Sequence, residues 1–432
     1  MVEELFDYIV VGAGSAGCVL AGRLSEDPAT RVLLLEAGPP NRSPWIHLPI
    51  GYTKTMWSDK LNWRFHTDPD PNMNGRRIYW PRGKTLGGSS SINGMIYTRG
   101  QREDYDHWAA LGNIGWSYLD VLPYFVKSEG NQRGFSVMHS GLGPLKVSDV
   151  GRKHELIEAF IQGAGQIGAS SVPPTDDFNG VYQEGAGYYQ LTTHKGWRWS
   201  AADAYLKPAR RRRNLRIETG AFAAGVVMEG TRAVGVRYRQ GGTMKTARCR
   251  GEVLLAAGAV QSPQLLQLSG IGPRAMLERH GIATLVDSPG VGENLQDHLQ
   301  IRLTFECTRR ITTNDQLNSW GGRLAMGLQW LLYRSGPLAI SPRPAASCAH
   351  CTAGTTGPQR ARPTCSSTSR LRRPRPSAAR CIRTRASRCR CASCGPSRAA
   401  TYASARPIRS SPPRSTPTTW RPNSIAAPQW PA

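Results

Sequence analysis

The feature that most constrains the fold is a glycine-rich turn between a strand and a helix near the N-terminus. Residues 6–11 are an unbroken, largely apolar run that predicts a buried strand of a parallel sheet. They lead directly into the spacing G-x-G-x-x-G at Gly12, Gly14 and Gly17, and residues 18–24 then have helical apolar spacing. A strand, this turn and a helix together predict an α/β protein with a nucleotide-binding start.

Each part of this segment has a physical role. Gly12 allows the tight turn, Gly14 lets a pyrophosphate approach the backbone, and Gly17 lets helix and strand pack closely. The helix N-terminus offers free N–H groups and a positive dipole end to phosphates. A second strand at residues 31–35 ends at Glu36, nineteen residues after Gly17, where a carboxylate can accept hydrogen bonds from ribose hydroxyls. The alternative is a glycine-rich turn without a ligand, and the motif alone does not separate FAD from NAD.

A second segment rich in small residues, 80–100, surrounds Asn93. Glycines at this density indicate a loop whose backbone approaches a ligand closely, with serine hydroxyls and Asn93 as donors. A flexible Ser/Gly linker is the alternative, but such a linker would not carry Trp80, Leu86 and Tyr97. Further along, residues 253–257 predict another buried strand. A helix should follow, with Ser262 as N-cap and Pro263 at its first position.

Three segments together carry a family resemblance. Residues 83–106, 258–272 and 289–298, with the N-terminal turn, strongly resemble the glucose–methanol–choline (GMC) oxidoreductases, most of all the choline and alcohol dehydrogenase branch. The resemblance extends over about residues 5–341. It implies an α/β fold in which a Rossmann-like FAD-binding domain is interleaved with an α+β substrate domain built on an antiparallel sheet. The C-terminal part of that fold is expected to be incomplete.

The resemblance also implies domain segments and a cofactor, FAD. The FAD-binding segments would be about 5–40, 78–110 and 215–300, and the substrate-domain segments about 143–210 and 300–341. By position, the residues implied to hold FAD are Gly12, Gly14, Ser15 and Gly17 at the pyrophosphate, Glu36 at the adenosine ribose, Gly87, Gly88, Asn93, Gly94, Met95 and Ile96 along the pyrophosphate and flavin, and Ala223 near the adenine. Some members tether the flavin through a histidine, whose matching position here is Ile92, so FAD is expected to bind non-covalently.

The implied reaction is oxidation of an alcohol to an aldehyde. A base removes the hydroxyl proton while hydride passes to flavin N5, and the substrate is expected to be a primary alcohol, choline-like, aliphatic or aromatic. In this family the base is a histidine in a stretch resembling His-Pro-x-Gly-Thr, which does not occur in this sequence. No catalytic residue is therefore assigned, and weak or absent activity is expected. The electron acceptor, O₂ or a quinone-type compound, and the oligomeric state are left open.

Composition changes abruptly after Ser341. Residues 342–432 contain seventeen Arg and seven of the ten Cys but no Lys, Asp, Glu, Phe or Val, and they show no apolar periodicity. This tail is predicted to be disordered. It carries +17 of the net charge of +25, so the first 341 residues hold a modest excess of 38 basic over 30 acidic side chains. The whole-chain charge is therefore not a sign of nucleic-acid binding.

A frameshift is one hypothesis for this tail. An acid-free mixture of Arg, Pro, Ala, Ser, Thr and Cys is typical of GC-rich coding DNA read out of frame. With chosen synonymous codons and a shifted frame, residues 344–349, 364–369 and 414–421 can encode segments that resemble the family's substrate domain, in the family's order. The rivals are a genuine basic tail that binds nucleic acid or an anionic membrane surface, and a flavin-binding remnant without catalysis.

The remaining features predict little further chemistry. Three Cys in the first 341 residues suit a reducing compartment, so a cytoplasmic location is expected, with peripheral membrane association left open. No run reaches the length of a membrane span. The four arginines 210–213 are interpreted as a solvated face, and no nucleic-acid partner is expected. No histidine has a partner at metal-ligand spacing, and the tail cysteines are spaced too loosely for zinc, so no metal is expected.

Overall fold

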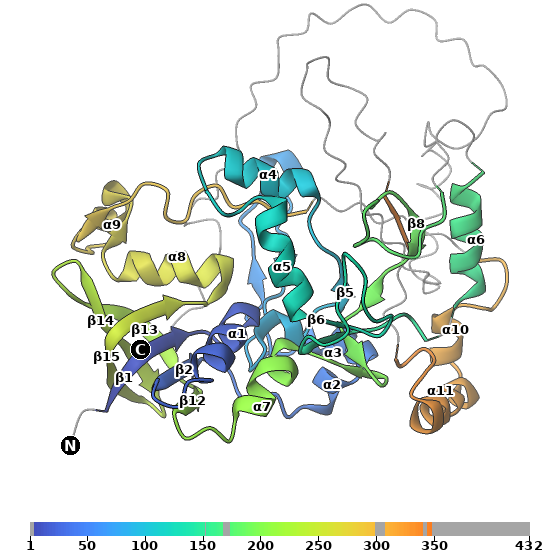
Figure 1. Ribbon diagram of the computed structural model, residues 1–432, viewed down its shortest axis with the longest axis horizontal. Coiled ribbons are helices and arrows are strands. Elements are labelled where there is room, and N and C mark those ends of the chain that lie inside the picture. The colour runs from blue at the N-terminus through green and yellow to red at the C-terminus, as the bar shows by residue number, and fades with distance from the viewer. Residues whose placement is uncertain (1–3, 152, 167–172, 299–306, 340–343, 348–432) are drawn as a thin grey trace, which may run out of the picture.

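The computed structural model describes residues 4–151, 153–166, 173–298, 307–339 and 344–347 (Figure 1). Its centre is a six-stranded sheet in the order β12-β2-β1-β15-β14-β13. The strands of this sheet are β1 (Leu5–Val11), β2 (Val32–Glu36), β12 (Leu215–Thr219), β13 (Phe222–Glu229), β14 (Arg232–Gln240) and β15 (Thr243–Leu255). The four neighbouring strands β12, β2, β1 and β15 run parallel, whereas β14 and β13 are antiparallel additions at one edge.

Strand β15 joins the two halves of this sheet. Its first half pairs with β14 in antiparallel register, from Gly235 opposite Arg248 to Gln240 opposite Thr243. Its second half pairs with β1 in parallel register and ends with Leu255 opposite Val11. Residues 253–255 of the predicted strand are thus the end of a strand of 13 residues, whereas Ala256 and Ala257 lie beyond its end.

Alternating side chains of the parallel strands form two cores, one on each face of the sheet. On one face, Val10 and Leu34 pack against α1 (Ser15–Leu24) through the small side chains of Cys18 and Ala21. The neighbouring π-helical turn η5 (Ala202–Leu206) and α7 (Lys207–Ala209) cover the rest of this face. Because all five residues of β2 are buried, the sheet is covered on both sides, as the apolar run in the sequence predicts.

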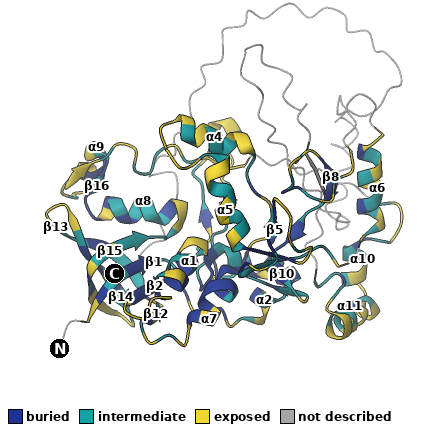
Figure 2. Cartoon of the chain, viewed as in Figure 1, coloured by how far each residue is buried: buried dark blue, intermediate teal, exposed yellow. Residues whose placement is uncertain are grey.

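The opposite face packs against α8 (Gly258–Leu268). Leu265 of this helix joins a cluster that includes Val11 and Leu35, and Figure 2 shows the buried colour concentrated on these central strands. The helix begins at Gly258, not after Ser262, so the predicted N-cap is wrong and Pro263 lies inside the helix. The physical reason is packing: Val260 is buried against Phe65, which stabilises an extra turn before the proline.

The second part of the molecule contains short helices and two-stranded sheets. The remaining helices and helical turns are α2 (Pro44–His47), η1 (Pro49–Gly51), α3 (Tyr52–Thr55), η2 (Pro71–Met73), η3 (Gly88–Ser91), α4 (Arg102–Ala110), α5 (Tyr118–Ser128), α6 (Glu155–Ala164), α9 (Arg274–Arg279), α10 (Thr313–Leu317) and α11 (Trp320–Tyr333). The remaining strands are β3 (Phe65–His66), β4 (Tyr79–Trp80), β5 (Ile96–Tyr97), β6 (Glu129–Asn131), β7 (Leu145–Val147), β8 (Gly185–Tyr188), β9 (Gln190–Leu191), β10 (Thr193–His194), β11 (Trp197–Arg198), β16 (Ile271–Gly272), β17 (Val286–Asp287) and β18 (Pro344–Ser347). In the ranges that the structure describes, none of these strands joins a sheet of more than two.

A buried ionic network links the strands of this second part. Glu129 at the start of β6 is fully buried and accepts a hydrogen bond from Arg99, with an N–O distance of 2.8 Å. His139 lies between two carboxylates, with Nδ1 3.0 Å from Glu129 and Nε2 2.9 Å from Asp177. The Asn131 amide also donates to Glu129 at 2.9 Å. The segments around Arg99, Glu129 and Asp177 are therefore joined by buried charge.

Strand β18 lies within the tail that composition predicts to be disordered. It pairs with β8 in antiparallel register, with Pro344 opposite Tyr188 and Ser347 opposite Gly185. The prediction of disorder therefore does not hold for these four residues, because a ladder is built from backbone groups and needs no apolar periodicity. Pro344 takes the first position, where a missing N–H is tolerated. The rest of the predicted tail lies outside the described residues.

Candidate functional site

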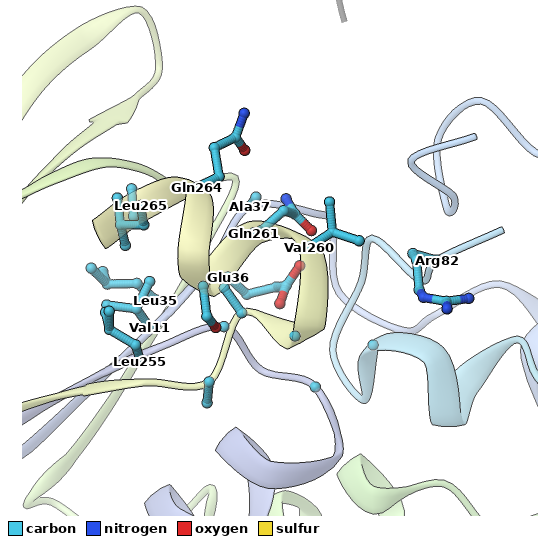
Figure 3. Close-up of a pocket in the computed structure, with 18 of the residues that line it drawn as sticks. Val11, Leu35, Glu36, Ala37, Arg82, Leu255, Val260, Gln261, Gln264 and Leu265 are labelled. Atoms are coloured by element: carbon cyan, nitrogen blue, oxygen red, sulfur yellow. The ribbon is translucent and has the colours of Figure 1, made fainter. Parts of the chain in front are cut away.

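A cavity of about 470 Å³ lies at the carboxyl ends of β1, β2 and β15 (Figure 3). This is where a parallel α/β sheet places its ligands, because the loops that leave neighbouring strands diverge there. The cavity wall includes six of the predicted cofactor residues: Gly12, Gly14, Ser15, Glu36, Gly88 and Ala223. Segments from residue 11 to residue 268 thus converge on one hollow.

The two glycine-rich segments meet at backbone distance beside this cavity. The Gly87 N–H donates to the Ala13 carbonyl at 2.7 Å. A Cβ atom on Gly88 would lie only 2.6 Å from the Gly14 Cα, and the φ of +51° at Gly88 also favours glycine. The chain therefore uses glycine here to bring together two loops that are 74 residues apart in sequence, Gly14 and Gly88.

Gly17 has the packing role that the sequence predicts, and it does not line the cavity. A Cβ atom on Gly17 would lie 1.8 Å from the Gly12 carbonyl oxygen, so helix α1 could not approach β1 with any side chain there. Gly12 itself has a φ of +95° and sits against Ala256 of the next loop. Within the motif, Gly17 therefore serves packing alone, whereas Gly12 both shapes the turn and lines the cavity.

The N-terminus of α1 points into this cavity. Its N-cap is Gly14, which has no side chain to satisfy the first N–H groups of the helix, and Ser15 and Ala16 line the wall beside it. Unsatisfied N–H groups and the positive end of the helix dipole favour an anionic ligand such as a phosphate group. The geometry therefore suits a pyrophosphate at the position the sequence predicts.

Glu36 contributes the acidic side of the cavity, at the end of β2. Its two carboxylate oxygens accept hydrogen bonds from the Ala13 N–H at 2.9 Å and the Gly38 N–H at 2.8 Å. Burial raises the pKa of this carboxyl to about 7, and the two backbone donors oppose that rise. Each oxygen keeps acceptor capacity for a further donor, such as a ribose hydroxyl.

Arg82, Gln261 and Gln264 also line the cavity, and sequence reasoning gave them no role. Arg82 is the one cation among the lining residues in the described part of the chain, and Figure 3 shows it across the hollow from Glu36. Burial lowers the pKa of its guanidinium. Its position inside the segment 80–100 is the signal that could have revealed it, because a cation beside a glycine-rich turn suits a phosphate ligand.

Two aromatic rings close another wall of the cavity. Trp63 and Phe222 lie with their ring centroids 6.1 Å apart and their planes at 64°, an edge-to-face pair. Phe222 begins β13 and directly precedes Ala223, so the wall expected near the adenine is apolar. Neither ring belongs to a recognisable short motif, which explains why sequence reasoning missed both.

The predicted residues Gly87, Asn93, Gly94, Met95 and Ile96 lie next to the cavity wall in sequence but do not line the hollow itself. Ile96 belongs to β5, which pairs with β9. Met95 is fully buried, with a φ of +61°.

Arg198 organises this segment from within the protein, a role that sequence reasoning missed. Its buried guanidinium donates to the Asn93 side chain at 2.8 Å, to the Asn93 carbonyl at 2.8 Å and to the Ser90 carbonyl at 3.1 Å. Burial lowers the pKa of this guanidinium to about 10. Arg198 therefore fixes the loop that begins at the Gly87–Gly88 contact.

In the ranges that the structure describes, no group of three or more His, Cys, Asp and Glu side chains could hold a metal ion. A membrane-crossing helix is likewise absent from these ranges, since none is both long and apolar enough.

Comparison with known proteins gives this geometry a context. The family model for GMC oxidoreductases matches residues 6–300, about two-thirds of the chain, and spans all the strands of the central sheet. The chain belongs to the GMC oxidoreductase family. The resemblance seen in the glycine-rich segments is thereby confirmed, as is the mixed α/β fold with its parallel-rich sheet.

Curated relatives share close to half of the aligned residues. The oxygen-dependent choline dehydrogenase of Brucella ovis is 46% identical over 330 residues, which cover 76% of this chain and 59% of that protein. The mitochondrial choline dehydrogenase of Homo sapiens is 48% identical over 336 residues, which cover 76% of this chain and 56% of that protein. The chain thus spans less than two-thirds of the length of these relatives.

Solved structures show the same fold. Pyridoxine 4-oxidase from Mesorbium loti is 35% identical, with a TM-score of 0.65 over 68% of this chain and 57% of that one. A variant of Aspergillus oryzae formate oxidase, studied for FAD modification, is 27% identical, with a TM-score of 0.70 over 80% of this chain and 61% of that one. The family and these flavoprotein neighbours imply FAD, and the glycine cradle, the helix N-terminus and Glu36 fit its pyrophosphate and ribose.

Proposed function

We propose that this chain holds FAD non-covalently and acts in the oxidation of an alcohol. The observation that carries the proposal is the convergence of Gly14, Gly88 and Glu36 at the carboxyl ends of the parallel strands. The proposed cofactor residues are those predicted from the sequence, together with Arg82. The proposed FAD-binding segments are about 5–40, 78–110 and 215–300, with substrate-side segments at about 143–210 and 300–341.

Each residue type has a distinct task in this proposal. The free N–H groups at the start of α1 bind the pyrophosphate, and Arg82 offsets part of its negative charge. Glu36 accepts hydrogen bonds from the adenosine ribose. Arg198 holds Asn93 and the loop around it in place. When bound, FAD supplies the hydride acceptor for oxidation of a CH–OH group.

Non-covalent binding is supported by Ile92, which stands where some family members carry a flavin-linked histidine. Its side chain is hydrocarbon only and is buried, so it offers no nucleophile for a covalent bond. A protein denatured in acid should therefore release all of its flavin into the supernatant. Flavin that stays with the precipitated chain would contradict non-covalent binding.

The proposed substrate is a primary alcohol, which is either choline-like, aliphatic or aromatic. The similarity to choline dehydrogenases supports an alcohol of this kind. Alcohol oxidation also needs a base within hydrogen-bond reach of the hydroxyl. No histidine lines the cavity in the described part of the chain, and the His-Pro-x-Gly-Thr stretch does not occur in the sequence. We therefore propose weak or absent turnover of alcohol by the 432-residue chain. The proposed location is the cytoplasm, with contact to a membrane surface allowed.

The first test measures FAD binding directly. Titration of the purified chain with FAD, followed by flavin fluorescence, should saturate at one flavin per chain. Gly14→Ala should weaken this binding at least tenfold and leave the unfolding midpoint nearly unchanged, because the added methyl meets only the Ala256 carbonyl, at 3.8 Å, and otherwise enters the cavity. Gly163→Ala, in an open position of α6, is the matched control and should leave FAD affinity unchanged.

The second test separates catalysis from binding. With FAD bound, the chain is mixed with choline and with simple primary alcohols in the absence of oxygen, and the flavin absorbance is followed. Slow or absent bleaching is the expected result, and it would equally describe a non-catalytic flavin-binding remnant. Rapid bleaching would contradict the proposed impairment. In that case the rate of reoxidation by O₂, compared with a quinone-type acceptor, identifies the electron acceptor.

A further inference from the structure

A second cavity lies at the C-terminal end of α1, whereas the nucleotide site lies at its N-terminal end. Its volume is about 550 Å³, and no residue that lines it also lines the first cavity. Four elements form its wall: the last turn of α1, the last turn of α5, the loop between β6 and β7, and the π-helical turn η5 with the start of α7. These elements come together near the centre of Figure 1.

The charge of this cavity is strongly one-sided. Arg23, Lys127, Lys146 and Arg212 all line it, whereas Glu26 is the one acidic side chain among its lining residues in the described part of the chain. Glu26 pairs with Arg23 at 2.7 Å, so it offsets only one of the four positive charges. Like charges gathered around a hollow repel one another, and a bound anion relieves that repulsion.

Two of the cations are held in position by the backbone. Lys146 Nζ donates to the Gly143 carbonyl at 3.0 Å, which orients its ammonium along the loop between β6 and β7. Arg212 donates to the Ser25 hydroxyl at 2.8 Å and to the Gly22 carbonyl at the end of α1. An ammonium or guanidinium with one fixed bond keeps further N–H donors for a ligand.

The arginine run 210–213 is a largely solvated face, as interpreted from the sequence, with Arg212 as the exception. Arg210, Arg211 and Arg213 are exposed, whereas Arg212 is half-buried and lines the cavity. The run therefore contributes one specific donor to the hollow. Sequence alone could not distinguish the four, because the turn after α7 decides which side chain faces inward.

The structure of the wall favours a small ligand over a nucleic acid. Tyr205 is the one aromatic residue of the lining in the described ranges, and it is only 8% exposed, so the wall offers no platform for stacked bases. Tyr205 belongs to the π-helical turn, and the Arg23 guanidinium of α1 lies over its ring, 5.7 Å from the ring centroid. Turns of this kind often occur at functional sites.

We propose that this cavity binds a small polyanion that carries phosphate groups. Two arginines supply paired N–H donors for phosphate oxygens, and the ammonium groups of Lys127 and Lys146 supply two further positive charges. Such a ligand would bridge α1 to α5 and to the loop between β6 and β7, and so join the nucleotide-binding sheet to the second part of the molecule.

The test uses the full chain saturated with FAD, so that the nucleotide site is filled, and titrates inorganic pyrophosphate by calorimetry. Saturable binding that weakens with added salt is expected. The double variant Lys127→Ala/Lys146→Ala should weaken it at least tenfold, and each single variant at least threefold. Lys245→Ala is the matched control, because this exposed lysine donates to Gln240 and does not line the cavity, and it should change nothing.

Three results would overturn the proposal: no saturable binding, binding that the double variant retains, or binding that appears only without FAD. Circular-dichroism melts of the variants verify that folding is intact. A parallel arm adds vesicles that contain an anionic phospholipid. Lysine-dependent sedimentation with vesicles but no pyrophosphate binding would assign these charges to a membrane surface and would also overturn the small-ligand proposal. None of these outcomes depends on alcohol oxidation.

Discussion

The central sheet and the network around Glu129 both join distant segments of the chain, but through opposite kinds of interaction. In the sheet, apolar strands are buried between α1 and α8, and glycines allow backbone to touch backbone. In the network, Arg99, Glu129 and His139 join separate segments through buried charge. The sheet tolerates changes of hydrophobic shape but not of glycine, whereas the network tolerates neither the loss nor the gain of a charge.

The largest effect is expected at Gly17 in the sheet region. Gly17→Ala places a methyl group 1.8 Å from the Gly12 carbonyl oxygen. Because this oxygen belongs to the backbone, it cannot rotate away as a flexible side chain could. We expect a loss of about 4 kcal/mol or more in the free energy of unfolding, or no folded protein. Urea denaturation followed by circular dichroism measures it, with Gly163→Ala as the control. A near-normal stability would mean that helix α1 does not approach β1 this closely.

The next effect is expected in the network. Glu129→Gln keeps the shape of the side chain but leaves Arg99 without its buried carboxylate, which should lower the free energy of unfolding by about 3–5 kcal/mol. The same denaturation assay measures the change. Asp176→Asn, at a carboxylate with 94% of its side chain exposed, is the control and should have little effect. If both variants unfold alike, the network is not what stabilises this part.

The two regions should also respond to different ranges of pH. Hydrogen bonds to Asp177 and Glu129 raise the pKa of His139 from 6.5 to about 9. The stability that its charge provides is complete below pH 6.5 and is lost as the pH rises through 9. His139→Gln should remove that decline. Melting temperatures measured from pH 6 to 9.5 test it, and identical slopes for both proteins would argue against a charged His139.

Glu36 acts in the lower range. Burial raises its pKa from 4.5 to about 7, so the folded state holds a proton that the unfolded state releases. The contribution of Glu36 to stability should fall as the pH rises from 4.5 to 7, since ionisation is disfavoured in the buried site. Glu36→Gln should flatten melting temperatures over this range. A decline of unchanged slope in the variant would assign the titration to another group.

The smallest effect is expected at the exposed pair Arg102 and Asp106 on α4. Their N–O distance is 3.4 Å, and each side chain is about half exposed. Arg102→Ala should change the free energy of unfolding by about 0.5 kcal/mol or less, because solvent screens exposed pairs. Chemical denaturation of this variant beside Glu129→Gln sharpens the contrast between exposed and buried charge. A change of several kcal/mol would show that the exposure of an ion pair does not predict its contribution to stability in this protein.

Sequence reasoning predicted the nucleotide-binding unit well because its signals are local. The strand at residues 6–11, the glycine spacing and Glu36 act within one stretch of chain, and Gly17 packs as predicted. The start of α8 was predicted wrongly, since burial of Val260 against a distant phenylalanine overrode the Ser-Pro signal. A local pattern cannot report a contact that the tertiary fold creates.

The network and the cavity wall could not be predicted for the same reason. Glu129, His139 and Asp177 are ordinary polar residues in sequence, and only the packing of β6 with two loops brings them together. Arg198 is likewise separated from Asn93 by 105 positions. The strand pairing of Pro344–Ser347 uses backbone groups, so the amino-acid composition could not predict it.

The position of β15 has a consequence for how the protein is made. β1 begins at Leu5, but its neighbour on one side is the end of β15, completed only at Leu255. A ribosome therefore delivers the first strand about 240 residues before its partner, and at 5–20 residues per second that interval is on the order of tens of seconds. During that time the edge of β1 is open to other chains. Slower translation of the codons before residue 255 should raise aggregation of the nascent chain more than slower translation of the codons after it.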